Sequence, residues 1–397
     1  MAIKVGVLGF AHGHVGAYLQ QWRDRPELDI QSVAGWDHDE ARLKASCDNF
    51  GLTPYTEVAD LLAQVDAVVV SVETSLHADL VEQAAAAGKA IIVQKPIALT
   101  MAQADRIVAA VEAAGVPFTM AWQMRTDPQN IQMKELIQSG ELGKVLMVRR
   151  RHALGTHLWP DFENTWHANP VYNRDIWADD ASHPIDMIQW LLGVPETVTA
   201  ELDTLINPKV PNDNGIAIFR YPGGPIAEVT CSFTCAAHEP TTEIVCEKGT
   251  IIQNFGDGPS AGVPRAEGAI GLKWYTVEKA DWTLSEIASP AGHGERIAGL
   301  AEPLSEFLHG KREPICTAED GRMSLRMLLA SYVSSRDGRR VCLCDPAMDA
   351  IPELGLGEPC CCGDIGVEGV PVVISGVVQG NVTVQFNRFD NRKKRKG

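Results

Sequence analysis

The chain has 397 residues, 45% of them hydrophobic and 22% charged, which is typical of a globular protein with room for two domains. Its formal net charge of −16 argues against nucleic acid or an anionic membrane as the main partner. No apolar run approaches the roughly 20 residues that a transmembrane helix needs. The first ten residues lack a cleavage pattern, and the cysteines are mostly scattered singly, so a cytoplasmic enzyme with reduced thiols is expected.

The first 122 residues alternate the signals of strands and helices. This alternation predicts βαβ units and a parallel sheet. Gly88 and Gly115 stand where left-handed helix caps are expected. The expected strands are residues 3–8, 30–36, 67–72, 90–93 and 118–121, and the expected helices are residues 14–25, 39–50, 76–87 and 101–114.

After residue 123 the pattern changes, because several strand-like stretches follow one another without helices between them. Such a series predicts a mainly antiparallel sheet. We therefore expect a first domain at 1–122, a second at 123–352, and a tail at 353–397 to which the sequence assigns no role. The expected strands are 145–150, 197–205, 216–221, 227–233, 242–246 and 250–253, and the expected helices are 128–139, one ending near 192, 294–309 and 318–335.

Residues 9–14 read GFAHGH, directly after the first strand and at the start of a helix. That context is the one required of a Rossmann phosphate loop, although GxGxxG is the usual pattern. Ala11 and His14 replace two glycines, while His12 or His14 could donate a hydrogen bond to phosphate. The alternative is a tight turn with surface histidines.

Asp37 follows the second predicted strand, where a carboxylate would accept hydrogen bonds from the adenosine ribose hydroxyls. The same charge would repel a 2′-phosphate, so NAD is favoured over NADP. Arg42 is a helical turn away and is not expected to reverse this preference. Asp37 could also cap the helix ahead of Glu40, and both roles could hold at once.

Residues 91–96 read IIVQKP, a short apolar run that predicts a buried strand ended by proline. Lys95 therefore lies at the carboxyl end of a strand, where open α/β sheets bind their ligands. A fixed cation there can polarise a carbonyl or stabilise a developing alkoxide.

A second chemical cluster contains Asp179, His183 and Asp186. Asp179 and His183 are four residues apart and would be neighbours on a helix, where a carboxylate could orient an imidazole that acts as a general base. Pro184 indicates that the helix begins or bends nearby. The alternative is a capped helix with His183 as a surface residue.

The stretch between these motifs is rich in tryptophan and histidine, which suits the C–H faces and hydroxyls of a sugar or polyol. For any single tryptophan, a place in the core is the alternative. A metal site is disfavoured, because the spacing of its candidate ligands matches no known motif. Those candidates are His152, His157, Asp161, Glu163 and His167. The cysteines at 360–362, with Cys342 and Cys344 upstream, could bind a soft metal, but adjacent cysteines lack C-x-x-C spacing and an unstructured tail is favoured.

Together these motifs resemble the glucose–fructose oxidoreductase, inositol dehydrogenase and rhizopine catabolism protein family (Gfo/Idh/MocA). The E-K-P signature of that family corresponds to residues 94–96, and its D-x-x-x-H-x-x-D signature to Asp179, His183 and Asp186. The S-L-H sequence at 75–77, Arg125 and the G-E-L-G sequence at 140–143 also match, and the resemblance spans about 1–352.

The resemblance implies an α/β Rossmann domain followed by an α+β domain with an open, mostly antiparallel sheet, through which a homo-dimer or homo-tetramer would form. It also implies that His183 takes a hydroxyl proton, that Lys95 stabilises the alkoxide, and that Asp179 holds the substrate and the histidine. The expected cofactor-binding residues are Gly9, Phe10, Ala11, His12, His14, Asp37, Ser71, Thr74, His77, Gln94 and Lys95, and the expected substrate-binding residues are Lys95, Arg125, Trp166, Asp179 and His183.

Three departures from the family pattern stand out. Gln94 replaces a glutamate, the phosphate loop is degenerate, and Arg174 with Asp175 replaces a pair of glycines, which should alter the substrate pocket. None of them removes a proposed chemical group.

The leading hypothesis is an NAD-dependent dehydrogenase acting on a sugar, sugar acid or cyclitol, without a metal. One alternative is an enzyme that retains NAD and cleaves a glycoside through a transient keto-sugar. Another is a regulatory protein that binds NAD without catalysis, although such a protein would need neither Lys95 nor His183.

Overall fold

The structure is a computed structural model and describes residues 2–237, 240–253 and 270–352. The expectations for the tail at 353–397 therefore lie outside the described residues. No helix in the described ranges is both long and apolar enough to cross a membrane.

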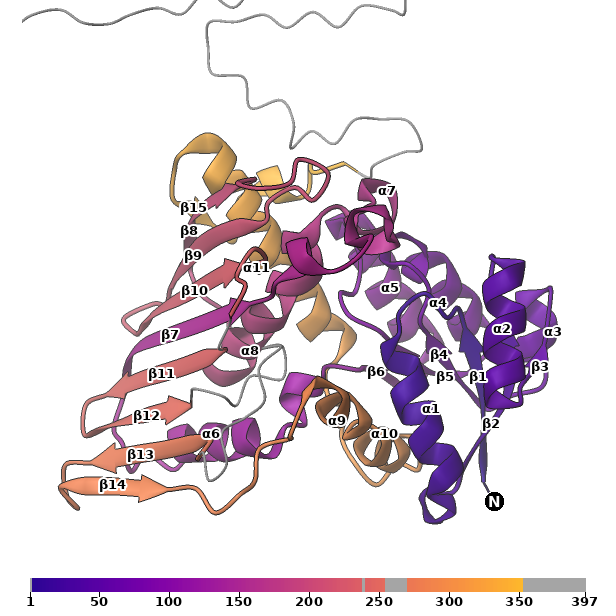
Figure 1. The fold of residues 1–397 in the computed structure, drawn as a ribbon, viewed down its shortest axis with the longest axis horizontal. Helices are drawn as coiled ribbons and strands as arrows, with labels where there is room; N and C mark the ends of the chain where they lie inside the picture. Colours follow the sequence, from indigo (N-terminus) through magenta and orange to yellow (C-terminus); the bar gives the residue numbers. More distant parts are fainter. Residues whose placement is uncertain (1, 238–239, 254–269, 353–397) are drawn as a thin grey trace, which may run out of the picture. The chain divides into compact units, whose positions relative to one another are not determined.

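The N-terminal part is a parallel sheet of order β3-β2-β1-β4-β5-β6, with helices on both sides (Figure 1). The valines and isoleucines of β4 and β5 are fully buried, as expected of strands covered on both faces. The order reverses between β1 and β4, and ligands of such sheets bind at this point, beyond the carboxyl ends of the strands. The strands are β1 (Ile3–Leu8), β2 (Ile30–Trp36), β3 (Thr53–Pro54), β4 (Ala67–Val70), β5 (Ala90–Val93) and β6 (Phe118–Met120), and the helices are α1 (His14–Asp24), α2 (Glu40–Phe50), α3 (Val58–Leu62), α4 (His77–Ala86) and α5 (Met101–Ala114).

The predicted parallel α/β sheet is confirmed, and most of its boundaries agree within a residue or two. Gly88 and Gly115 have positive φ angles, as expected of residues that close helices. The expectations missed β3 and α3, which are too short to show a clear periodicity. Helix α4 begins at His77 and not at Leu76, because a 3₁₀ turn precedes it.

The second sheet has the order β14-β13-β12-β11-β7-β10-β9-β8-β15. Its pairs are antiparallel except for β7 with β10, so the expected mostly antiparallel sheet is confirmed with one parallel pair at its centre. The sequence missed β13, β14 and β15. The strands are β7 (Val145–Ala153), β8 (Thr197–Asp203), β9 (Asn214–Arg220), β10 (Ile226–Ser232), β11 (Thr241–Cys246), β12 (Gly249–Gln253), β13 (Leu272–Thr276), β14 (Asp281–Leu284) and β15 (Val341–Cys342).

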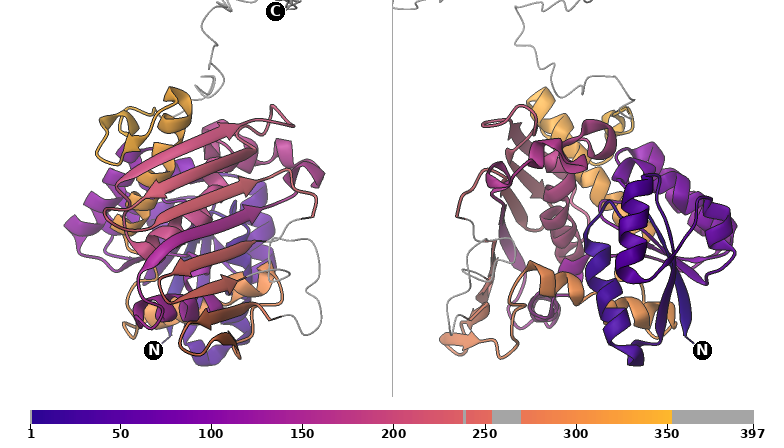
Figure 2. Two further views of the ribbon diagram at one scale, coloured as in Figure 1. Left: turned by 90° about the vertical axis from the view of Figure 1, so that its left-hand side faces the viewer. Right: turned by 45° about the vertical axis from the view of Figure 1, so that its right-hand side comes forward.

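Helices cover one face of the second sheet, and its other face is open toward the viewer in the left panel of Figure 2. The open face carries the exposed side chains of Met147, Ile216 and Ile218. The expected helix at 294–309 is divided in two near Gly299. The helices are α6 (Pro128–Gln138), α7 (Pro170–Asn173), α8 (Ser182–Leu192), α9 (His293–Ala298), α10 (Ala301–Leu308) and α11 (Ala318–Asp337).

The described cysteines fall into two groups. The five expected to be reduced are free thiols: Cys47, Cys231, Cys235, Cys246 and Cys316. Cys342 and Cys344 form a disulfide beside β15, so this pair does not support a soft-metal site. The cysteines at 360–362 lie outside the described residues.

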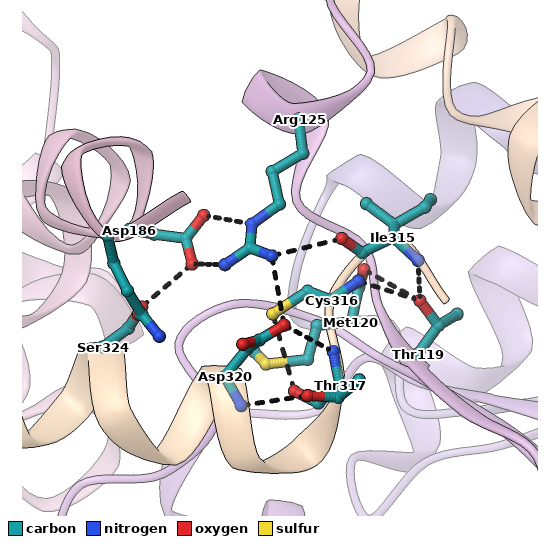
Figure 3. Close-up of polar contacts among 10 residues, drawn as sticks. Thr119, Met120, Arg125, Asp186, Ile315, Cys316, Thr317, Asp320 and Ser324 are labelled. Carbon is teal, nitrogen blue, oxygen red and sulfur yellow. Dashed lines mark hydrogen bonds and ion pairs between the residues drawn. The ribbon is translucent and has the colours of Figure 1, made fainter. Parts of the chain in front are cut away.

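Arg125, expected among the substrate-binding residues, has its guanidinium engaged at a junction of helices (Figure 3). Its guanidinium donates two hydrogen bonds to Asp186, at 2.9 and 2.7 Å, and contacts Asp320 at 3.3 Å. Arg125 is only 6% exposed and Asp186 is fully buried. Asp320 also belongs to the capping box that starts α11, so the arginine connects α8 to the first turn of α11.

Replacing Arg125 by methionine should lower the free energy of unfolding by about 3–5 kcal/mol, because it leaves the Asp186 carboxylate buried without a cation. Urea denaturation at neutral pH would measure this loss. The matched control is Arg106→Met, which removes exposed ion pairs to Asp79 and Glu82 and should cost no more than about 1 kcal/mol. Equal small losses for both variants would contradict the structural role of Arg125.

Candidate functional site

A cavity of about 710 Å³ lies between the phosphate-loop end of the first sheet and the helical side of the second domain. Five of the expected site residues line it: His12, His14, Lys95, Asp179 and His183. The structure thus brings together side chains that are far apart in the sequence. A cavity of this size is in the range of small-molecule sites.

Lys95 follows the end of β5, and its ammonium group makes a buried ion pair with Asp179. Lys95 Nζ donates to Asp179 Oδ1 at 2.7 Å and to the Asp179 backbone carbonyl at 3.2 Å. Both side chains are almost completely buried. The interaction fixes a cation beside the cavity, with one carboxylate as its counter-charge.

The other oxygen of Asp179 accepts a hydrogen bond from His167 Nδ1 at 2.7 Å. Burial alone would raise the pKa of Asp179, but the charge of Lys95 and the hydrogen bond from His167 hold that pKa well below its usual range. Asp179 is therefore ionised at neutral pH. The sequence had placed His167 among the ring residues of this stretch and among the disfavoured metal ligands, without predicting its contact with Asp179.

Asp179 does not contact His183, although the sequence placed them on one helical face. Residues 177–181 form a π-helical turn, η7 (Trp177–Ala181), ahead of α8. In a π turn the hydrogen bonds run from i to i+5, so residues four apart no longer face each other. The carboxylate near His183 is instead Asp180, whose two oxygens lie 3.5 Å from His183 Nε2 and 3.5 Å from His152 Nε2.

His183 is neutral at physiological pH. Burial lowers its pKa well below 6.5, and the nearby charge of Lys95 lowers it further, with smaller effects from His152, His14 and His293. Its Nδ1 is buried and has no hydrogen-bond partner within the part of the chain that the structure describes. A neutral imidazole with an unused nitrogen beside a cavity can accept a proton.

The phosphate-loop end of the cavity has the features that a dinucleotide needs. Helix α1 has Gly13 at its N-cap, without a side-chain cap, so backbone N–H groups at this end remain available for an anion. Both ring nitrogens of His12 are buried without a partner among the described residues, and burial lowers the pKa of His12 well below 6.5. Gly9 has a φ of +89°, and a Cβ there would collide with the backbone of Val72. The loop therefore fits NAD, which these groups would hold at its phosphates.

Asp37 is more fully engaged than expected, because Arg42 folds back onto it. The guanidinium donates to both carboxylate oxygens at 2.8 Å, and Phe10 N donates to one of them at 2.7 Å. The expectation that no arginine stands beside Asp37 is therefore wrong. The cap of α2 is also different, since Asp39 and not Asp37 accepts from the backbone N–H of Arg42.

Arg42 also contacts Glu73 at 2.9 Å, so two carboxylates surround one guanidinium. His38 joins this group through Glu73, at 2.8 Å. Two carboxylates against one guanidinium give Asp37, Glu73 and Arg42 together a formal excess of negative charge. The repulsion of a 2′-phosphate that was expected from Asp37 alone would come from this whole group.

The remaining expected cofactor residues support the surrounding loops. Ser71 donates to the carbonyl of His12, and Thr74 donates to Asn173. His77 lies 3.2 Å from the carbonyls of Ile97 and Val72, and only one of these contacts is a hydrogen bond when the ring is neutral. Gln94 donates to the Tyr18 hydroxyl through Nε2. Its Oε1 is buried and has no hydrogen-bond partner among the described residues.

Trp166 does not line the cavity but contacts two residues beside it, Ala11 of the phosphate loop and His167. Its indole N–H donates to the carbonyl of Ala11 at 3.0 Å, and its ring stacks on His167 with centroids 3.9 Å apart. Arg174 and Asp175, expected to alter the pocket, do not line the cavity either. Arg174 donates to the carbonyl of Leu99, and Asp175 accepts from Tyr332.

The site also contains residues that the sequence did not single out. Asp180 and His293 both line the cavity. Asp180 lies next to Asp179 but was given no role of its own, and His293, at the start of α9, belongs to no motif. The candidate metal ligands are divided: His152 and His167 line the main cavity, whereas the other three line a separate cavity of about 170 Å³. Across the described ranges, no three histidine, cysteine or acidic side chains are grouped to hold a metal ion.

Comparison with known proteins identifies relatives over most of the chain. The chain is 28% identical over 348 residues to D-apiose dehydrogenase of Paraburkholderia graminis, which covers 82% of this chain and 85% of that protein. It is 29% identical over 322 residues to inositol 2-dehydrogenase 3 of Saccharopolyspora erythraea, covering 76% of this chain and 90% of that protein.

Among solved structures, the WlbA dehydrogenase of Bordetella pertussis, crystallised with NADH and UDP-GlcNAcA, superposes with a TM-score of 0.68. The match is 25% identical and covers 86% of this chain and 99% of the other. Residues 3–122 match the family described as an oxidoreductase family with an NAD-binding Rossmann fold, and residues 130–252 match the GFO/IDH/MocA C-terminal domain. The chain therefore belongs to the Gfo/Idh/MocA family of oxidoreductases, with an NAD-binding Rossmann domain.

Proposed function

We propose that the protein oxidises a hydroxyl-bearing carbon of a sugar, sugar acid or cyclitol, with NAD as the hydride acceptor. The observation that carries this proposal is the single cavity that joins the phosphate-loop end of α1 to Lys95, Asp179 and His183. The names of the two relatives, an apiose dehydrogenase and an inositol dehydrogenase, support the substrate class. The glycoside-cleaving and regulatory alternatives gain no support from the comparisons.

In this proposal the chain's own groups move the proton and stabilise charge. His183, neutral and with an unused nitrogen, accepts the hydroxyl proton as the hydride leaves the same carbon. Lys95 stabilises the negative charge that develops on the oxygen. Asp179 keeps the ammonium group in place, and Asp180 lies where it can orient His183.

The assembly of the protein is a second part of the proposal. The open face of the second sheet supports a homo-dimer or homo-tetramer, because apolar side chains such as Met147, Ile216 and Ile218 are exposed on it. The five free cysteines support a reducing, cytoplasmic location and the Cys342–Cys344 disulfide weighs against it, so cell fractionation would test this part of the proposal.

We expect NAD to bind at least about tenfold more tightly than NADP, because the group of Asp37, Glu73 and Arg42 keeps a net negative charge. Calorimetry on the purified protein would measure both affinities. Arg42→Ala should widen the preference, since it removes the cation and leaves the two carboxylates. Equal or tighter binding of NADP by the unaltered protein would contradict the assignment.

His183→Ala should lower turnover by about 10²–10⁴, the usual range for a general base, with little change in NAD affinity. Raising the pH should partly restore its activity, because hydroxide can then accept the proton. Lys95→Met should also lose turnover but should not recover at high pH, since a missing fixed charge does not titrate. Absorbance of NADH gives the rates, and calorimetry gives the NAD affinity.

The unaltered enzyme offers a further check of the same assignment. A base must be deprotonated, so turnover should fall only as the pH drops through the lowered pKa of His183, well below 6.5. At pH 6 it should therefore remain close to its neutral value. If only Lys95→Met regains activity at high pH, Lys95 and not His183 is the base. If both variants keep full activity, the proposed mechanism is wrong.

Replacing both Ile216 and Ile218 by lysine should dissociate the assembly, because two charges would be buried in the interface. Sedimentation velocity would compare the masses of the variant and the unaltered protein. Val194→Lys is the control, since Val194 is exposed but lies on no strand, in the connection between α8 and β8. A monomeric unaltered protein would contradict the proposed assembly.

A further inference from the structure

The lining of the cavity contains two chemically different sets of side chains. One set is charged or titratable and includes Lys95, Asp179 and His183. The other set, called the apolar wall here, consists of Leu154, Leu158, Trp159, Phe162 and Ile176, of which Leu158 is 60% exposed and Trp159 is 48% exposed. Large apolar side chains that line a cavity and yet remain exposed mark a place where an apolar ligand group can be buried.

The rings of this wall form a continuous series from the surface to the ion pair. Trp159 meets Phe162 edge-on, with centroids 5.6 Å apart, and Phe162 is parallel to His167 at 6.1 Å. His167 then bonds to Asp179, the partner of Lys95. A ligand whose hydroxyl reaches Lys95 would therefore lie along this wall as it extends outward.

The segment that carries the wall is held in place by the second sheet. Thr156 donates to the carbonyl of Phe233 through both its backbone N–H and its hydroxyl, the latter at 2.8 Å. Trp159 N donates back to the Thr156 carbonyl at 3.0 Å, which closes the turn. The backbone that carries Leu158 and Trp159 is thus held by hydrogen bonds within the turn and to the residue that follows β10.

The C–H face of a sugar or polyol can stack on an aromatic ring, but its hydroxyl groups would lose water without gaining partners against the aliphatic Leu154, Leu158 and Ile176. We infer that the substrate carries an apolar ring beside its reacting sugar or cyclitol part, as in a glycoside with an aromatic aglycone. The inference rests on the proposed function. The carbon loses a hydride to NAD⁺, and its hydroxyl loses a proton to His183. The product is a ketone with the apolar ring still attached.

Matched pairs of glycosides would test this inference: the methyl and phenyl forms of β-D-glucoside, β-D-galactoside, α-D-mannoside and β-D-xyloside. Each would be added to the NAD-loaded protein, with NADH formation followed by absorbance and binding followed by calorimetry. For a sugar that reacts, we expect the phenyl form to have a KM at least about tenfold lower than the methyl form, equivalent to burying one ring against apolar side chains.

Trp159→Ala should remove most of this advantage, so that the two KM values approach each other. Trp282→Ala is the control, because Trp282 is also an exposed tryptophan but lies on β14, away from the cavity. Its phenyl advantage should equal that of the unaltered protein.

The outcomes separate this inference from the proposed function. Equal KM values for the methyl and phenyl forms, or an advantage that survives Trp159→Ala, would overturn the apolar subsite while leaving the dehydrogenase intact. Phenyl-dependent binding without NADH would support the subsite and contradict the dehydrogenase. Absence of both binding and NADH with every pair would overturn both. A change of oligomeric mass in Trp159→Ala would mean that a second copy covers the wall, which also overturns the subsite.

Discussion

The ion pair between Lys95 and Asp179 determines the arrangement of the site, because it joins the first sheet to the segment that carries the histidines. Burying two charges is costly unless each has further partners. Here the ammonium group also donates to a backbone carbonyl, and the carboxylate also accepts from His167. With those contacts the pair is satisfied on both sides, and the cation is fixed where charge would develop on a substrate oxygen.

Lys95 also affects the protonation of the histidines around it. Burial is the largest cause of the lowered pKa of His183 and of His12, and the nearby charge of Lys95 lowers both further. The cavity thus combines the ammonium group of Lys95 with several neutral imidazoles. Neutral imidazoles can donate or accept hydrogen bonds, which suits a substrate with many hydroxyl groups.

Much of the fold followed from local patterns, because short apolar strands between helices leave few alternatives. The place of Lys95 at a strand end also followed, since proline stops the strand directly after it. The partner of His183 did not, because a π-helical turn shifts the carboxylates by one position and no residue pattern announces such a turn. The roles of Arg42 and Arg125 were missed for another reason: a long arginine side chain can bond to residues that its position in the sequence does not indicate. Arg42 folds back onto Asp37, and Arg125 bonds to Asp186 and Asp320.

The phosphate loop shows how a degenerate motif can keep its shape. Two of its external contacts are made through its main chain: Ala11 offers its carbonyl to Trp166, and Phe10 offers its N–H to Asp37. Neither contact depends on which side chain stands at position 10 or 11. For these two contacts the sequence requirement lies on Trp166 and Asp37 and not on positions 10 and 11, whereas Gly9 of the same loop stays restricted by its positive φ.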